Sequence, residues 1–187
     1  MTPRLPSVLS KLDLPQAELS AARLDGELFR VDDCFAPVDE IEQPRHRAAA
    51  LRARLPSRLI AEQRSAAWIW GALSAPPSHH QLCAAVDARV RPPGVGWMTV
   101  REVVIDPEDL YTVDDLLVTT PRRTAIDIAR FSDHFGAEEV SIVTELMRLG
   151  KCDAVECLTE MDRRRNLPNK RRAAQRLLDC AGGSPSG

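Results

Sequence analysis

The sequence predicts an α+β protein in which a small N-terminal unit packs on a small mixed sheet, followed by a C-terminal helical bundle. Helical spacing and then two short strand patterns occupy the first forty residues, strand and helix signals alternate through the middle, and nearly continuous helical signals follow Pro121. A chain of 187 residues has room for one domain or for one domain with a small addition. Its 44% hydrophobic and 28% charged residues are typical of a globular protein and exclude collagen or extended disorder.

The first 42 residues have the element order of a winged helix-turn-helix. We expect a short helix over 4–12, a second helix from Gln16 that ends at Gly26, and strands Leu28–Val31 and Cys34–Val38 around the turn Asp32-Asp33. Gly26 suits a helix end because it tolerates positive φ. About 40 residues is marginal for an independent core, so this unit should pack on the rest of the chain.

The second predicted domain covers residues 43–182, and 183–187 form a tail. It starts with an Arg-rich amphipathic helix, and Thr120 with Pro121 provides a cap and a first helical turn for a later one. The expected elements are a helix Arg45–Leu55, a strand Leu59–Ala61, a helix capped by Ser65, strands Leu82–Val90, Trp97–Ile105 and Leu116–Val118, and helices 121–131, 134–149, 153–165 and 168–180.

Charge alternates in blocks along the chain. Residues 1–44 carry a net −5, 45–101 carry +7, 102–162 carry −10 and 163–187 carry +6. Such blocks can pair with one another inside the fold, or they can form separate faces for different partners. Both interpretations stay open at this point.

The sequence contains no recognisable catalytic motif. A PD-(D/E)-x-K nuclease needs an acidic residue two positions before a lysine, and Leu9, Leu149 and Pro168 stand there instead. His79 and His80 are neighbours that point to opposite faces of a strand, which disfavours a shared metal ion. We therefore expect no enzyme, no metal and no cofactor; a degenerate nuclease with residual phosphodiesterase activity is a weaker alternative.

Cysteine usage and hydropathy indicate a cytoplasmic protein. The 5 cysteines are an odd, scattered set, which fits reduced thiols. The N-terminus lacks the apolar stretch of a signal peptide, and the longest uncharged apolar run, Ala66–Leu73, is too short for a membrane span.

Individual cysteines and tryptophans are assigned to the core. Cys152 and Cys157 fall on different faces of a predicted helix, so both are interpreted as buried structural thiols. Trp68 and Trp70 are assigned to the core rather than to base stacking.

Two stretches resemble the AbiEi-type antitoxins of type IV toxin–antitoxin systems. The stretch AELSAARLDGELFRVDDCFAPVDE resembles the end of the family's winged helix. SRLIAEQRSAAWIWGAL, followed by LLVTTPRRTAIDIAR, resembles its second domain with the pattern T-x-P-x-R-T-x-x-D-x-A-R. A related group carries the same two parts before a Vsr-like endonuclease domain. The resemblance implies a bacterial, non-enzymatic regulator that binds operator DNA, represses its own operon and counters a nucleotidyltransferase toxin.

The motif residues form a structural or interaction group. Arg123 and Asp127 lie four residues apart on one helix face and can pair, and apolar residues between them supply a packing face. We favour a scaffold role over direct contact with a partner. The full group is Ser65, Thr120, Arg123, Thr124, Asp127 and Arg130.

The candidate DNA contacts follow from helical spacing. Gln16, Ser20 and Arg23 fall on one side of the second predicted helix, and Arg30 begins the hairpin. The next helix adds Arg45, Arg47 and Arg52.

The turn Asp32-Asp33 predicts repulsion of phosphates, so whether the hairpin permits DNA binding is left open. The Arg45–Arg64 and Arg163–Arg176 segments are alternative basic regions that could bind DNA phosphates. A protein-interaction module that has lost DNA binding is the alternative function, motivated by the acidic 102–162 block.

Overall fold

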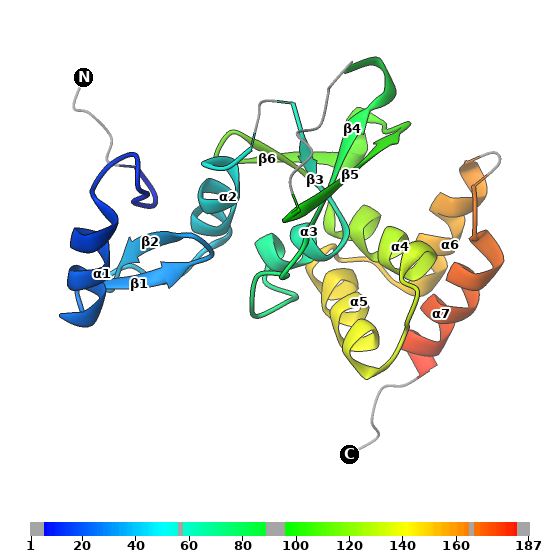
Figure 1. Cartoon of the computed structure of the whole chain (residues 1–187). Coiled ribbons are helices and arrows are strands. Elements are labelled where there is room, and N and C mark those ends of the chain that lie inside the picture. Colours follow the sequence, from blue (N-terminus) through cyan, green and yellow to red (C-terminus); the bar gives the residue numbers. More distant parts are fainter. Residues whose placement is uncertain (1–5, 56–57, 89–95, 165–166, 183–187) are drawn as a thin grey trace.

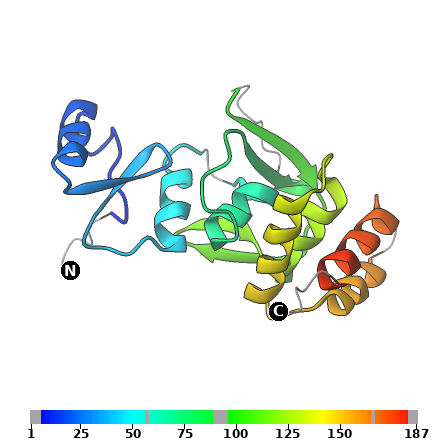
Figure 2. The same ribbon diagram turned by 90° about the horizontal axis from the view of Figure 1, so that it is seen from below.

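The computed structural model describes residues 6–55, 58–88, 96–164 and 167–182. These residues form seven α-helices and two β-sheets, which confirms the α+β class. The N-terminal hairpin unit lies at one end of the molecule and the last two helices lie at the other, in both views (Figures 1 and 2). The predicted tail 183–187 falls outside the described residues.

The N-terminal unit contains α1 (Gln16–Leu24) and the antiparallel hairpin of β1 (Leu28–Val31) and β2 (Cys34–Pro37). The helix expected over 4–12 is wrong for residues 6–12. Leu9 pairs with Phe35 instead: its N–H donates to the Phe35 carbonyl at 2.7 Å, and the Phe35 N–H donates back at 2.9 Å. This pairing buries Val8 against the hairpin, which a solvent-facing helical turn would not do. Within the described residues, α1 is the only helix before the hairpin.

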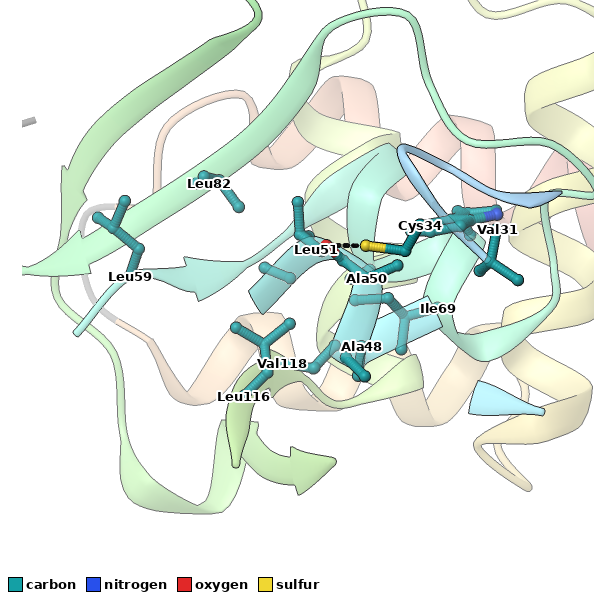
Figure 3. Packing of buried hydrophobic residues seen from close by; sticks show 14 of the residues in the cluster. Val31, Cys34, Ala48, Ala50, Leu51, Leu59, Ile69, Leu82, Leu116 and Val118 are labelled. Atoms are coloured by element: carbon teal, nitrogen blue, oxygen red, sulfur yellow. Dashed lines mark hydrogen bonds between the residues drawn. The ribbon is translucent and has the colours of Figure 1, made fainter. Parts of the chain in front are cut away.

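The hairpin unit shares its core with the rest of the chain. Val31 and Cys34 belong to the same buried cluster as Leu51 of α2 (Pro44–Arg52) and Val118 of the sheet. Figure 3 shows this packing, with the Cys34 thiol 3.9 Å from the Ala50 carbonyl oxygen. Apolar residues from both sides of the predicted boundary at residue 42 thus share one buried cluster.

The larger sheet has five strands in the order β5-β4-β3-β7-β6. It is mixed, because β3 pairs antiparallel with β4 and parallel with β7, while β4 and β5 are parallel and β6 and β7 antiparallel. The strands are β3 (Ile60–Ala61), β4 (His80–Ala85), β5 (Met98–Val103), β6 (Leu110–Val113) and β7 (Leu116–Thr119).

Two strand predictions need correction. The strand expected over Leu82–Val90 ends at Ala85, and Val86–Ala88 form a 3₁₀ turn; residues 89 and 90 lie outside the described residues. The edge strand β6 is absent from the predicted elements, because its residues are half-exposed or exposed and show no buried apolar pattern.

Helix α3 (Gln63–Trp70) begins earlier than predicted. Its N-cap is Glu62 and Gln63 has φ +46°, so the assignment of the cap to Ser65 is wrong. The buried Ser65 hydroxyl instead accepts a hydrogen bond from the Gln81 N–H at 2.9 Å and lies 3.0 Å from His80 Nδ1. Trp68 is buried, as expected of a core residue.

Four helices complete the chain: α4 (Pro121–Phe131), α5 (Ala137–Leu149), α6 (Ala154–Arg163) and α7 (Lys170–Gly182). Thr120 caps α4, since its hydroxyl accepts from the Arg123 N–H at 3.3 Å, as predicted. A second apolar cluster joins these helices to α3. None of the helices in the described part is long and apolar enough to cross a membrane.

Candidate nucleic-acid interface and motif cluster

A pocket of about 490 Å³ opens between α1, the hairpin and the end of α2. Four predicted DNA contacts, Gln16, Ser20, Arg23 and Arg30, line it together. Lys11, from the turn before α1, and Arg54, just after α2, line the same pocket. The structure thus gathers the contacts predicted on α1 and the hairpin into one surface.

The lining of the pocket carries a net positive charge. Its lining includes four basic side chains, Lys11, Arg23, Arg30 and Arg54, and one carboxylate, that of Asp33. Arg23 is exposed, and no carboxylate of the described residues lies within ion-pair distance of it. A concave surface with this balance of charge attracts phosphate groups and places N–H donors around them.

The acidic turn does not project into solvent as a pair of free carboxylates. The Asp32 side chain is 11% exposed and lies between Arg54 Nη1, at 3.2 Å from its Oδ2, and His80 Nε2, at 3.5 Å. Asp33 pairs with Arg54 at 2.7 Å and with Arg30 at 3.2 Å. Arg30 and Arg54 thus neutralise part of the negative charge that the sequence places at the turn.

The surroundings of Asp32 favour its charged form. Burial opposes ionisation, but the nearby His80 and Arg54 outweigh it and lower the pKa of Asp32. At 3.5 Å the contact with His80 is too long for an ordinary hydrogen bond, and Nε2 of this buried histidine has no other partner within the described part of the chain. The Asp32 side chain is therefore held mainly by Arg54, whose Nη1 donates a hydrogen bond to Oδ2 at 3.2 Å.

The three arginines predicted on α2 lie outside the pocket. Arg45 pairs with Glu40 at 2.9 Å, and Arg52 lies 3.7 Å from Asp114. Arg47 donates from Nη1 to the carbonyls of Trp68, at 2.6 Å, and Leu73, at 3.3 Å. Arg47 thus ties α2 to α3.

The motif residues of α4 form a buried charge cluster. Asp127 accepts hydrogen bonds from Arg123 at 2.8 Å, from Arg130 at 2.8 Å and from Arg101 of β5 at 3.2 Å. Arg123 also donates to Asp109 at 2.6 Å. One carboxylate thereby joins three guanidinium groups and connects α4 to the edge of the sheet.

Two further carboxylates complete this cluster, and the sequence did not indicate either. Arg101 donates two hydrogen bonds of 2.6 Å to the Glu62 carboxylate. Arg164 donates to the Asp109 carboxylate at 2.6 and 2.7 Å. Burial raises the pKa of Glu62 even though the bonds from Arg101 oppose the shift. These partners come from distant parts of the chain, so no local spacing marks them.

Thr124 completes the motif. Its hydroxyl donates to a backbone carbonyl at the start of α4 and lies 2.7 Å from the Thr119 hydroxyl. The motif side chains therefore face the interior, as a scaffold requires. No cluster of three potential metal ligands occurs among the residues that the structure describes.

Comparisons with known proteins agree with this architecture. The model of the AbiEi antitoxin C-terminal domain family matches residues 45–180, which include the whole charge cluster. The chain belongs to the AbiEi antitoxin family. Its fold is similar to the crystal structure of the RV2827C protein from Mycobacterium tuberculosis, with 21% identity, a TM-score of 0.51, and coverage of 97% of this chain and 74% of that chain. No curated protein matches the sequence.

Proposed function

We propose that this chain is a DNA-binding regulator of the antitoxin type, which receives duplex phosphates in the pocket between α1 and the hairpin and represses its own operon. The observation that carries the proposal is the charge of that pocket: Arg30 and Arg54 pair with the Asp32-Asp33 turn, while Lys11 and Arg23 have no carboxylate within ion-pair distance among the described residues. Phosphate contacts supply a large share of the affinity of a protein for DNA, so a cationic surface of this kind suits DNA binding.

Next to this cationic pocket, helix α1 carries side chains that can hydrogen-bond to the edges of DNA bases. Gln16 and Ser20 are one turn apart, with Gln16 Nε2 3.4 Å from Ser20 Oγ, and Arg23 follows on the same side. Glutamine and arginine can make paired contacts to adenine and guanine in the major groove. In this proposal α1 acts as the recognition helix and the hairpin as a short wing.

The body of the chain, residues 43–182, serves a protein partner in this proposal. Family membership supports a toxin as that partner, and the family resemblance points to a nucleotidyltransferase. A catalytic role of the body is not favoured, because Asp127 and Glu62 both accept hydrogen bonds from arginine and neither is free to act as a base. We place this non-enzymatic protein in the cytoplasm.

A gel-shift titration of the full chain tests the proposed binding to DNA. At about 50 mM salt we expect retardation of a duplex from upstream of its own gene, with weaker retardation of a random duplex and a steep loss as salt rises. Absence of binding to both duplexes would remove the proposal. In that case, co-purification with a basic protein partner would favour the interaction module instead.

A further inference from the structure

Cys152 and Cys157 lie next to each other at the junction between α5 and α6. Their sulfur atoms are 3.9 Å apart. The prediction that they occupy different faces of one helix is wrong, because α6 begins only at Ala154 and Cys152 precedes it. The remaining cysteines, Cys34, Cys83 and Cys180, are buried.

The geometry of the helix start explains why the two thiols meet. Asp153 is the N-cap of α6: its side chain accepts from the Glu156 N–H at 2.8 Å, and its own N–H donates to the Glu156 carboxylate at 3.0 Å. Cys152 therefore occupies the position before the cap and Cys157 the fourth helical position. Side chains at these two positions normally pack together as a hydrophobic staple, and here both are cysteine.

The end of α5 fixes the other side of the pair. The chain reverses at Gly150 and at Lys151, which has φ +50°, and the Cys152 N–H returns to the Met147 carbonyl at 3.0 Å. A Cβ on Gly150 would lie 3.3 Å from Cys152 Sγ and 3.2 Å from the Arg122 backbone nitrogen. Cys152 is thus held close to Cys157 by backbone hydrogen bonds and close packing on both sides.

The two thiols differ in access and acidity. Cys152 is half-buried, whereas Cys157 is fully buried beneath it. The hydrogen bond with Cys157 and the charge of Arg122 lower the pKa of Cys152, and the same bond together with burial raises that of Cys157. An accessible, more acidic thiol above a protected second thiol is the arrangement of a peroxide-reactive pair.

We propose that Cys152 and Cys157 form a reversible oxidation site that closes to an intramolecular disulfide on reaction with a hydroperoxide. The Cys152 thiol gives its proton to solvent, and the thiolate attacks the peroxide O–O bond; this gives a Cys152 sulfenic acid and an alkoxide or hydroxide, which takes a proton back from solvent and leaves as an alcohol or water. The Cys157 sulfur then attacks the sulfenic sulfur, the S–O bond breaks, and the hydroxide leaves as water with the Cys157 proton. The two thiols lose two electrons and the peroxide gains them. The sulfur atoms must approach from 3.9 Å to a bond length of about 2 Å for the disulfide to close.

Peptide mass spectrometry of the reduced full chain, treated with limiting hydrogen peroxide and then alkylated, tests this site. We expect a linked peptide pair containing Cys152 and Cys157, lighter by two hydrogen atoms and restored by dithiothreitol, while Cys83 and Cys34 remain thiols. In Cys157→Ser we expect a Cys152 sulfenic acid that dimedone traps. In Cys152→Ser we expect no oxidation at the buried Cys157.

Two results would overturn the proposal. One is a wild-type protein in which Cys152 advances to sulfinic acid without linkage. The other is a Cys152 that reacts with iodoacetamide no faster than Cys83, where we expect a difference of at least about 10-fold from its access and acidity. Both readouts apply to wild-type protein, so they do not depend on the folding of a variant.

Discussion

Replacing Asp127 by Asn is expected to lower the free energy of unfolding by about 3–5 kcal/mol. The substitution keeps the size of the side chain but removes the charge that three guanidinium groups share, those of Arg101, Arg123 and Arg130. Arg123 and Asp127 are only 5% and 1% exposed, so water cannot replace the lost partner. Arg123 keeps Asp109 and Arg101 keeps Glu62, so most of the expected loss comes from Arg130, whose buried guanidinium has Asp127 as its carboxylate partner.

Urea unfolding followed by circular dichroism measures this loss at neutral pH. Glu145→Gln is the matched control, because Glu145 also pairs with an arginine on its own helix, at 2.6 Å from Arg148, but at the surface. We expect the control midpoint to stay unchanged, since exposed pairs contribute little. Equal destabilisation of the two variants would contradict a scaffold role for the buried cluster.

Asp32→Asn should lower stability by about 1–2 kcal/mol near pH 7, after allowance for solvent screening of a partly exposed pair. Asparagine tolerates the left-handed backbone of this position, where φ is +53°, so the change removes charge without adding strain. The lost interactions are those with Arg54 and His80, which hold the hairpin turn on the sheet.

The loss at Asp32 should depend on pH in a definite direction. The pKa of Asp32 is lowered in the folded protein, so its contribution is complete above the unfolded pKa of about 4 and disappears as pH falls through the lowered folded value. Unfolding titrations at several pH values between neutral and acidic should show the wild-type and variant curves converging in acid. A difference that persists unchanged at the acidic end would exclude an electrostatic origin. Asp33→Asn, at a half-exposed position, should have a smaller effect at every pH.

Elements with strong local signals could be predicted from the sequence. Thr120 with Pro121 marks the start of α4, and the pair Asp32-Asp33 separates β1 from β2 with the predicted boundaries of β1 intact. The grouping of Gln16, Ser20 and Arg23 on one side of α1 also follows from local spacing, because residues three or four apart on a helix share a face. Their presence in one pocket is a consequence of that spacing.

Features that depend on docking could not be predicted. Arg54 enters the pocket only because the hairpin turn packs beside the end of α2. Glu62 and Arg101 are separated by 39 positions, and nothing in either neighbourhood marks a partner. The contact of Cys152 with Cys157 could not be predicted for a different reason: it depends on which residue caps α6.

The most direct test of the account compares the salt dependence of DNA binding in two double variants of equal net charge. Lys11→Ala/Arg23→Ala removes two cations from the pocket, and Arg148→Ala/Arg163→Ala removes two highly exposed arginines from α5 and α6, away from the hairpin unit (Figure 1). If both pocket residues contact phosphates, the slope of log affinity against log salt becomes shallower by about 1.8 in the first variant. We predict that slope change and a loss of affinity of about 10- to 100-fold at 50 mM salt for the pocket variant, with wild-type behaviour for the control. Equal slopes for the two variants would show that the pocket is not where this protein meets DNA.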